Sequence, residues 1–464
     1  MNLDNIHSVY FLGIGGIGMS AIARYFNAKG KSVSGYDKTS TPLTDELQAE
    51  GIQIHFDDTL ESIPFPIRNQ KEEVLVIMTP AVPESHNGLN FFKNGGFTIK
   101  KRSEVLGILT EQSYTIAVAG THGKTTTSSM IAHILKASNV DCTAFLGGIT
   151  KNYNSNLLLP SKNNEQPTNI VVVEADEYDR SFLTLHPDIT VITSMDADHL
   201  DIYGDKSFLE ESFRLFANQT KSGGILIAKQ DLPLNNDKAI SYSILKPAEF
   251  KAENIRVEKQ YYTFDLVTPS GTIKDLQLGL PGTHNVENAV AAVTVALKMG
   301  ISNDHIKKAL ASFTGVKRRF DYQVRTEKLV YIDDYAHHPE ELKACIHSVK
   351  EIFPNKKITG IFQPHLFTRT RDFADGFAES LSLLDELLLM EIYPARELPI
   401  EGVNSEMLLK KMSLKNKMIC SKEELVREVE KRNIEVLLTL GAGDIDQFVE
   451  PLKKMLEKRV TEIN

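Results

Sequence analysis

The sequence has few cysteines, and this scarcity excludes two classes of protein. Its 464 residues contain three of them, Cys142, Cys345 and Cys420, which lie far apart and show no CxxC spacing. The spacing indicates neither a disulfide framework nor a cysteine-based zinc site. The chain also has no low-complexity tract and no solenoid repeat. A protein of the reducing cytoplasm fits these features.

Long hydrophobic runs and an excess of basic residues are also absent. No apolar run approaches the ~18 residues that a membrane-spanning helix needs. The apolar start VYFLGIGGIGM lacks the basic segment that opens a signal peptide. With 52 basic and 61 acidic residues, the net charge is −9, which gives no general attraction to nucleic acid or anionic membrane. We therefore expect a cytoplasmic protein that binds neither, and that holds any phosphate at a local site.

Short apolar runs alternate with amphipathic stretches along the whole chain, a pattern typical of parallel α/β units. At ~150 residues per domain, the length suggests about three domains. Strands are predicted in three series, each forming one doubly wound sheet: 8–12, 32–36 and 74–78; then 114–120, 169–176 and 188–194; then 328–334, 357–363, 386–392 and 435–444. Helices are predicted near 18–29, 101–110 and 285–298, and the polar stretch 154–169 is predicted to be a surface loop.

The predicted fold class is therefore α/β with three domains. A Rossmann-like domain occupies residues 1–112, and a central P-loop ATPase-like domain with a mostly parallel sheet occupies 113–318. A second Rossmann-like α/β domain occupies 319–464. The boundaries are expected near 111–114 and 314–320, each to within several residues.

The first chemical motif is GIGGIG, directly after the first strand and before an amphipathic helix. In this setting, backbone N–H groups and the helix N-terminus bind a pyrophosphate, and an acidic residue after the second strand accepts hydrogen bonds from a ribose. NAD, FAD and a UDP-sugar all present a pyrophosphate, and a tight turn without a ligand is the plainer alternative. The candidate substrate-binding residues are Gly13, Gly15, Gly16, Gly18 and Asp37.

The second motif is AVAGTHGKTTTSSM, which has Val118 where the GxxxxGK[ST] pattern has its first glycine. The lysine, the hydroxyl and the helix N-terminus of a phosphate-binding loop are all still present. Such a loop holds phosphate oxygens with backbone N–H groups, its lysine reaches the β- and γ-phosphates, and its threonine coordinates Mg²⁺. The candidate ATP-binding residues are Gly120, Thr121, His122, Gly123, Lys124, Thr125 and Thr126.

Acidic residues follow two predicted strands of the central domain. EADEYD carries Glu174, and DADHLD carries His199. Because the carboxyl ends of parallel strands gather at one edge, these groups are expected near the phosphate loop, where they could draw Mg²⁺ to a triphosphate. Solvent-facing loop residues are the alternative, which we prefer for Asp179 and Asp201 taken singly.

Polar clusters also occur in the second half of the chain. His284 and Asn288 lie in an Ala- and Val-rich helix and are expected to read an adenine edge, although a helix cap at Thr283 explains part of this pattern. In GVKRRFDY we expect an arginine to reach the γ-phosphate as domains close. After two strands of the last domain, polar groups suited to a small anionic substrate gather: Asp334, Tyr335, His337, His338, His365, Arg369 and Arg371.

These motifs together resemble the Mur ligase family, and within it the branch that adds alanine to UDP-N-acetylmuramate. The likeness runs in order through GIGGIGMSAIA, GTHGKTTT, EADEYD, DADHLDIYG, GTHNVENAVAA, GVKRRFDY, DDYAHHPEE, FQPHLFTRTRD and GAGD, and so covers nearly the whole chain. The resemblance implies that the glycine turn holds UDP pyrophosphate, the central domain ATP, and the last domain L-alanine. It implies phosphorylation of the substrate carboxylate and attack of the amine on the acyl phosphate.

By the same resemblance, Lys124, His199, Arg319 and His338 would be catalytic. Metal would be held by Thr125, Glu174 and His199. ATP would also contact His284, Asn288, Arg319 and Asp334, and the amino acid would contact His338 and Arg369.

Two positions depart from the family pattern. Phe213 stands where several sister ligases have a carbamylated lysine, and Leu366 stands where many alanine-adding members have arginine. The first departure agrees with the alanine-adding branch, and the second passes that arginine's role to Arg369 or Arg371. No general base is assigned, since His337 and His338 are candidates by chemistry alone.

Three other functions stay open at this stage. A tripeptide-recycling ligase of the same family would act on the same sugar nucleotide. An NAD-dependent oxidoreductase would use the glycine turn but not the phosphate loop. A nucleotide-switch or transport ATPase would not use the polar clusters of the last domain.

Overall fold

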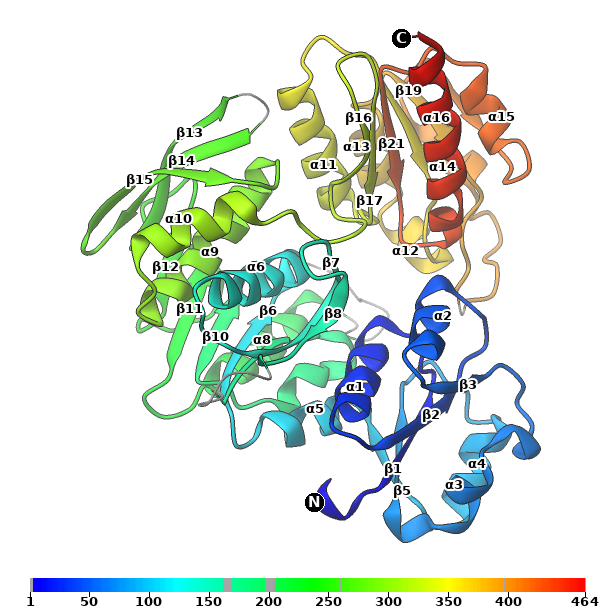
Figure 1. Cartoon of the computed structure of the whole chain (residues 1–464). Coiled ribbons are helices and arrows are strands. Elements are labelled where there is room, and N and C mark those ends of the chain that lie inside the picture. Colours follow the sequence, from blue (N-terminus) through cyan, green and yellow to red (C-terminus); the bar gives the residue numbers. More distant parts are fainter. Residues whose placement is uncertain are drawn as a thin grey trace. The chain divides into compact units, whose positions relative to one another are not determined.

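The computed structural model describes residues 3–161, 169–196, 203, 205–258, 261–395 and 397–463. Packing divides the chain into two compact units. The first unit comprises Met1–Lys251, Leu266–Ile273 and Asn288–Leu310, and the second comprises Ala252–Asp265, Lys274–Glu287 and Ala311–Asn464. Three helix-flanked sheets form the fold, which confirms the predicted α/β class (Figure 1). Among the described residues, no helix has the length and apolar content to cross a membrane.

The first sheet has five parallel strands in the order β3-β2-β1-β4-β5. The central strand SVYFL is buried along its whole length, as expected of a parallel strand covered on both faces. The order reverses beside β1, which creates the switch point where the glycine turn lies. The strands are β1 Ser8–Leu12, β2 Ser32–Tyr36, β3 Gln53–His55, β4 Val74–Met78 and β5 Thr98–Lys101; the helices are α1 Ile17–Ala28, α2 Pro42–Ala49, α3 Phe65–Asn69, α4 Asn87–Asn94 and α5 Arg102–Thr110.

The second sheet has ten strands in the order β15-β14-β13-β12-β11-β10-β6-β9-β7-β8. Its centre is parallel, and β8 joins β7 in antiparallel orientation. The strands are β6 Tyr114–Ala119, β7 Thr143–Thr150, β8 Ser155–Leu158, β9 Ile170–Glu174, β10 Ile189–Ile192, β11 Ile225–Lys229, β12 Ile240–Ser243, β13 Phe250–Glu258, β14 Tyr261–Thr268 and β15 Gly271–Leu278. The helices are α6 Lys124–Ala137, α8 Lys206–Asn218, α9 Thr283–Lys298 and α10 Asn303–Ser312, with the 3-10 helix η4 Tyr178–Thr184.

The predicted surface loop at 154–169 is wrong in its first part, because Ser155–Leu158 forms β8. Three of these four residues are buried against the rest of the unit, so the segment is an edge strand in spite of its polar composition. Residues 162–168 of the same stretch lie outside the described residues.

The third sheet has six strands in the order β16-β17-β21-β18-β19-β20, of which only β16 is antiparallel among the described residues. The four strands predicted for this region are confirmed. The strands are β16 Asp321–Arg325, β17 Val330–Asp334, β18 Ile358–Phe362, β19 Glu386–Leu389, β20 Lys417–Ile419 and β21 Val436–Leu440; the helices are α11 Pro339–Ile352, α12 Phe367–Asp372, α13 Ala374–Leu381, α14 Ser405–Lys411, α15 Leu425–Glu430 and α16 Val449–Ile463.

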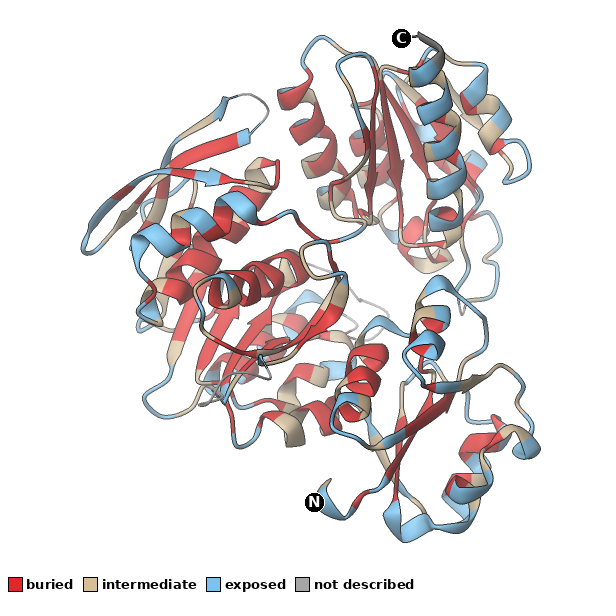
Figure 2. Cartoon of the chain, in the orientation of Figure 1, coloured by how far each residue is buried: buried red, intermediate tan, exposed pale blue. Residues whose placement is uncertain are grey.

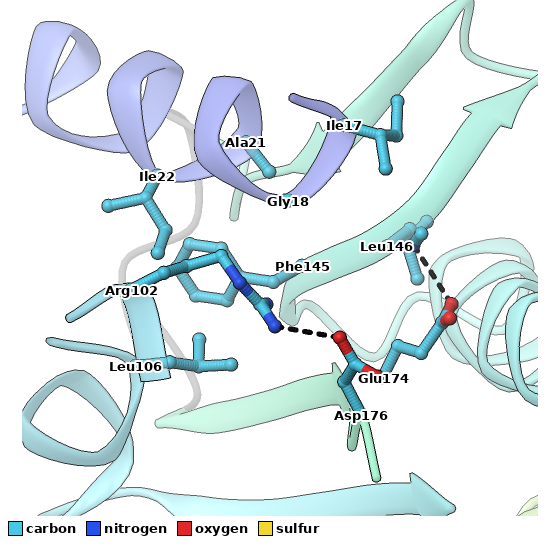
Figure 3. Close-up of a pocket in the computed structure, with 11 residues that line it drawn as sticks. Ile17, Gly18, Ala21, Ile22, Arg102, Leu106, Phe145, Leu146, Glu174 and Asp176 are labelled. Carbon is cyan, nitrogen blue, oxygen red and sulfur yellow. Dashed lines mark hydrogen bonds and ion pairs between the residues drawn. The ribbon is translucent and has the colours of Figure 1, made fainter. Parts of the chain in front are cut away.

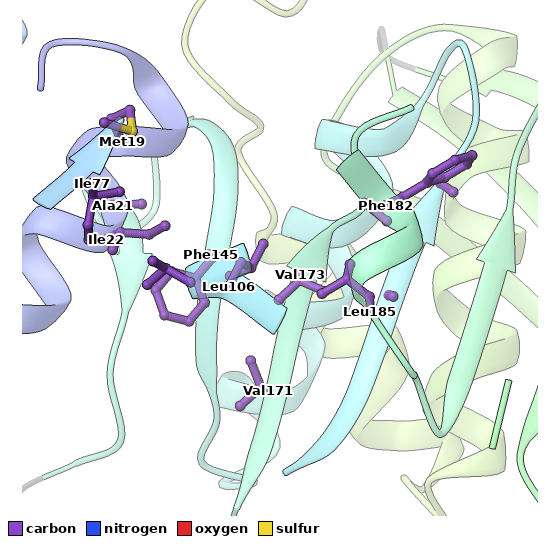
Figure 4. Close-up of a cluster of buried hydrophobic side chains, with 14 of the residues drawn as sticks. Met19, Ala21, Ile22, Ile77, Leu106, Phe145, Val171, Val173, Phe182 and Leu185 are labelled. Atoms are coloured by element: carbon purple, nitrogen blue, oxygen red, sulfur yellow. The ribbon is translucent and has the colours of Figure 1, made fainter. Parts of the chain in front are cut away.

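A buried cluster in the first unit joins the first sheet to the second. Apolar residues of α1 pack towards the central sheet, and Figure 4 shows Ile22 close to Phe145 of β7 and Leu106 of α5. The central strands β1 and β4 of the first sheet and β6, β9 and β10 of the second are buried along most of their length (Figure 2). Phe213 packs edge-on against Phe182 in the same cluster. The glycine-turn helix and the phosphate-loop sheet therefore share one core.

Candidate active site

The glycine turn is tied to the end of β2. The N–H groups of Gly13 and Ile14 both donate to the carbonyl oxygen of Tyr36, at 2.8 and 3.0 Å. Asp37 Oδ2 accepts a hydrogen bond from Gly15 N at 2.7 Å, so this carboxylate stabilises the glycine turn. Gly13 has φ +86°, a conformation that favours glycine. The predicted contact of Asp37 with a ribose stays a prediction.

The phosphate loop joins β6 to α6 and begins after Val118. Val118 is a buried strand residue that pairs in register with Glu174 of β9, so the missing glycine belongs to the strand. The loop proper has its two glycines in left-handed backbone conformations, with φ +140° at Gly120 and +84° at Gly123. The loop therefore keeps the glycines that its backbone path requires.

The loop is held by the end of β10. Ser194 Oγ accepts from His122 N at 2.7 Å and lies 2.9 Å from Thr121 Oγ1. Thr193 Oγ1 donates to the carbonyl oxygen of His122 at 2.5 Å. Because the end of β10 fixes the loop, the N-terminus of α6 has a defined direction. Thr125 and Thr126 lie buried in the first turn of this helix.

Lys124 is enclosed by acceptors at the loop. Its Nζ donates to the carbonyl oxygen of Gly120 at 2.6 Å and to Glu177 Oε1 at 2.8 Å. Burial lowers the pKa of Lys124, whereas Glu177, Glu174 and Asp176 raise it, and the net direction is upward. The ammonium is therefore charged at neutral pH and lies where a phosphate needs a cation.

Asn288 lies beside the loop, and its predicted contact with adenine stays a prediction. Its Oδ1 accepts from Thr127 Oγ1 at 3.3 Å, and it lies 2.5 Å from where a Cβ on Gly123 would be. His284, one helical turn earlier on α9, has its Nδ1 3.4 Å from Ser348 Oγ. Burial lowers the pKa of His284 to about 4, so the imidazole is neutral at pH 7.

The carboxylates after β9 meet the loop at one edge of the sheet. Glu174 Oε2 accepts from Gly147 N at 3.0 Å, and Asp176 pairs with Arg102. Within the described part of the chain, no group of three His, Cys, Asp or Glu residues is placed to hold a metal ion. His199, predicted as a catalytic and metal-binding residue, lies outside the described residues. The oxygen donors Thr125 and Glu174 suit Mg²⁺, which takes few protein ligands beside substrate phosphates.

A cavity of about 160 Å³ lies between α1 and the end of β9 (Figure 3). Gly18 and Ile22 line one side, and Glu174 and Asp176 line the other. Arg102 crosses it towards Asp176, with Nη2 3.0 Å from Oδ2. Sequence reasoning missed Arg102, whose only signal was its place at the start of a helix directly after a parallel strand.

In the second unit, the predicted linker arginines have different surroundings. Arg318 donates to Asp333 Oδ2 at 3.2 Å and to the carbonyl oxygen of Gly441 at 2.7 Å, which makes it part of the framework. Arg319 lies over the ring of Tyr335, 5.0 Å from its centroid. Its Nη1 also lies 3.9 Å from Glu341 Oε1, and the predicted contact of Arg319 with a phosphate stays a prediction.

Asp334, predicted to contact ATP, is engaged with the backbone. Its two carboxylate oxygens accept from Phe320 N and Ala336 N, both at 2.7 Å. Burial raises the pKa of Asp334 to about 6. The geometry assigns it a supporting role for the linker, and direct contact with ATP stays a prediction.

The predicted amino-acid cluster is only partly assembled. The rings of His337 and His365 lie 6.2 Å apart, and Arg369 is buried. Arg371, by contrast, is half-exposed and pairs with Asp372 at 2.7 Å, so the two arginines have different surroundings.

Two further residues near this cluster, His338 and Leu366, are buried. His338 is buried at the N-terminus of α11, where its Nδ1 accepts from Glu340 N at 3.4 Å. Leu366 is buried and has φ +70°, which is strained for leucine. Its N–H donates to the carbonyl oxygen of Tyr393 at 2.9 Å, which helps to hold this conformation.

Three sequence profiles match the chain in order. The profile described as "Mur ligase family, catalytic domain" matches residues 8–114, and "Mur ligase middle domain" matches 118–296. The profile "Mur ligase, glutamate ligase domain" matches 318–443.

Curated relatives extend the likeness over the full length. A protein of Flavobacterium johnsoniae named UDP-N-acetylmuramate--L-alanine ligase is 53% identical, with 99% of this chain and 100% of the relative covered. A protein of the same name from Cytophaga hutchinsonii is 51% identical and covers 100% of both chains.

Solved structures show the same fold. The UDP-N-acetylmuramate-alanine ligase of Thermotoga maritima has a TM-score of 0.81 at 28% identity, covering 97% of this chain and 99% of its own. A murein peptide ligase of Psychrobacter arcticus has a TM-score of 0.70 at 21% identity, covering 97% and 98%, and shows the fold alone.

Proposed function

The chain belongs to the Mur ligase family, and from that premise we propose that it joins L-alanine to the carboxylate of UDP-N-acetylmuramate at the expense of ATP. The observation that carries the substrate assignment is the 53% identity, over the full length of both chains, to a relative named for this reaction. The protein is thus an ATP-dependent carboxylate-amine ligase of peptidoglycan synthesis, acting in the cytoplasm, where ATP and sugar nucleotides occur.

The phosphate loop holds the nucleotide in this proposal. Backbone N–H groups from Gly123 to Thr125 surround the phosphates, and Lys124 leaves Glu177 to meet the β- and γ-phosphate oxygens. Thr125, Glu174 and His199 would hold Mg²⁺, which neutralises charge on the phosphoryl group when bound. Asn288 lies beside the loop and would contact the adenine side together with His284.

The proposed reaction has two covalent steps. An oxygen of the substrate carboxylate attacks the γ-phosphorus, and the bond from the γ-phosphorus to the β-phosphate oxygen breaks. ADP departs, and the substrate carboxylate has become an acyl phosphate. The alanine amine then attacks the carbonyl carbon, loses a proton, and phosphate leaves. Lys124 and Arg319 act by position and charge and form no covalent bond to substrate.

The division of labour follows the predicted domains. We assign UDP-sugar binding to residues 1–112. In this domain the glycine turn Gly13–Gly18 and Asp37 would contact the nucleotide part of the substrate. ATP chemistry falls to residues 113–318 and amino-acid binding to 319–464, where His338 and Arg369 would serve the alanine. His337 and His338 are the two chemical candidates for the base that takes the amine proton.

Formation of ADP with a panel of amines tests the function. Purified protein is incubated with ATP, Mg²⁺ and UDP-N-acetylmuramate, and with alanine, serine, glycine or the preformed tripeptide in turn. We expect ADP and phosphate with alanine, and none when the sugar nucleotide is omitted. Turnover with the tripeptide alone would assign the chain to peptide recycling, and NADH oxidation without ATP would contradict a ligase.

A further inference from the structure

Arg102 is the cation among the described residues that line the cavity between α1 and β9. It begins α5 directly after β5, at the carboxyl edge of the first sheet, where ligands of such sheets bind. Its side chain reaches below α1 to Asp176, with Nη2 3.0 Å from Oδ2 (Figure 3). The side chain is one-fifth exposed, so the guanidinium faces the cavity with little bulk water around it.

The last glycine of the GIGGIG motif, Gly18, makes room for this arginine. A Cβ on Gly18 would lie 3.0 Å from Nη1 and 3.2 Å from Cδ of Arg102, closer than ordinary van der Waals contact. Glycine at this position therefore lets the guanidinium pack against the first turn of α1. The motif places a cation next to the turn on which the sugar nucleotide is proposed to bind.

The charges in the cavity show why a substrate would need this cation. Glu174 and Asp176 contribute two carboxylates, against one guanidinium. A third carboxylate entering between them would be repelled unless a cation met it. The guanidinium has five N–H donors, and Asp176 Oδ2 accepts from one of them at Nη2, so a second carboxylate can bind to the same group.

The position of Arg102 suits the carboxylate of the ligand better than its diphosphate. The glycine turn supplies backbone N–H groups for the diphosphate, whereas the cavity ends at Glu174, which pairs in register with Val118 just before the phosphate loop. The reactive end of the sugar nucleotide must reach this place to meet ATP. We propose that Arg102 binds the carboxylate of UDP-N-acetylmuramate and shares its guanidinium between that group and Asp176; this inference rests on the function proposed above.

Direct binding measurements without ATP or Mg²⁺ test the inference. Calorimetry compares UDP-N-acetylmuramate with UDP-N-acetylglucosamine, which has the same diphosphate and hexosamine but no carboxylate. For Arg102→Gln we expect the first ligand to bind roughly 10- to 100-fold more weakly, the range for a charged hydrogen bond. The second ligand should bind within about threefold of wild type. Arg102→Lys, which keeps the charge but not the fork, should give an intermediate loss.

Two neighbouring variants are the controls. Lys101→Gln removes the adjacent cation, whose pair with Asp179 is half-exposed, and should leave both affinities unchanged. Asp176→Asn frees Arg102 and should not weaken the muramate ligand. If Asp176→Asn reproduced the loss seen in Arg102→Gln, the pair would be structural and the inference overturned.

The remaining outcomes separate the two proposals. Equal weakening of both ligands by Arg102→Gln and Arg102→Lys would assign the arginine to the diphosphate and overturn the inference, as would unchanged affinity for both. Either result, together with wild-type ADP formation from alanine, leaves the proposed function intact. Absence of any wild-type turnover with the sugar nucleotide would instead reject the function itself.

Discussion

Lys124 Nζ and Glu177 Oε1 lie 2.8 Å apart at the base of the phosphate loop, and both side chains are largely buried. The lysine that is proposed to meet ATP is therefore neutralised by a carboxylate 53 residues later in the chain. Breaking such a pair by removing one partner leaves the other as an uncompensated buried charge. Function and stability at this site are thus coupled through one contact.

Lys124→Ala is expected to lower ADP formation at least about 100-fold, because it removes a cation from the transferring phosphoryl group. The free energy of unfolding should fall by about 3–5 kcal/mol, since Glu177 stays buried without its partner. Binding of UDP-N-acetylmuramate should persist, as the glycine turn is separate from this pair. Turnover assays, urea unfolding and calorimetry give the three values.

A double variant separates the two effects. Lys124→Met with Glu177→Gln removes both charges and should recover most of the stability without recovering turnover. Restored turnover in the double variant would show that Lys124 has no role in phosphate chemistry.

Gly123→Ala should weaken ATP binding more than its backbone strain alone explains. A Cβ there would lie 2.5 Å from Asn288 Oδ1, so Asn288 must move from its contact with Thr127. Gly223→Ala is a matched control, because Gly223 has φ +80° against +84° at Gly123 and nothing within 4 Å of its Cβ position. Both variants should lose about 1 kcal/mol of stability or more from strain.

The comparison of KM for ATP decides this prediction. We expect an increase of roughly tenfold in Gly123→Ala and no change in Gly223→Ala. Equal values of KM in the two variants would contradict a role for Asn288 in nucleotide binding.

The sequence predicted best those elements whose burial leaves a continuous apolar run. VYFL in β1 and VVV in β9 are covered on both faces of their sheets, so each strand can be predicted from one continuous apolar run in the sequence. Strands β13 to β15 were not predicted, because charged residues and exposed positions interrupt them. β8 was missed for a related reason, since it lies in a polar segment and is recognised only by its partner β7.

The sequence predicted those parts of the candidate site that lie at the ends of parallel strands. It did not predict the single hydrogen bonds that are formed in turns. The place of Glu174 beside Val118, directly before the phosphate loop, follows from parallel register. The bond from Gly15 N to Asp37 and the two backbone donors to Asp334 depend on local turns. One of those turns puts Phe320 at φ +47°, which residue type does not indicate.

Asp334 should give the protein a defined pH dependence of stability. Burial raises its pKa to about 6, above the unfolded value of about 4, so the folded state binds the proton more tightly. This contribution is fully present below pH ~4 and is lost as the pH rises through 6, by roughly 3 kcal/mol. Asp334→Asn cannot ionise and should lack this fall.

Urea unfolding between pH 3.5 and 7.5 measures the difference in slope. The amide disturbs one backbone hydrogen bond at every pH, so a constant offset between the two proteins is expected and does not bear on the prediction. Parallel curves for wild type and Asp334→Asn would show that the carboxyl group titrates as it does in the unfolded chain.

Asn156 of β8 is expected to set the position of the glycine-turn helix. Its Nδ2 donates to the carbonyl oxygen of Ile17 at 2.6 Å and to Ser20 Oγ at 2.8 Å, and its Oδ1 accepts from Arg24 Nη1 at 2.6 Å. Asn156→Ala leaves buried polar groups of α1 without these partners, which costs about 1–3 kcal/mol for each.

Because α1 carries the turn for the sugar nucleotide, Asn156→Ala should raise KM for UDP-N-acetylmuramate at least about fivefold and change KM for ATP less than twofold. Asn27→Ala is the matched control on the same helix, since it removes one exposed hydrogen bond to the carbonyl oxygen of Glu50. Asn156→Asp keeps the acceptor for Arg24 but loses both donors, so it should restore only the part of the stability that depends on Arg24. An equal rise of both KM values in Asn156→Ala would mean that the residue supports the whole unit and does not position the helix.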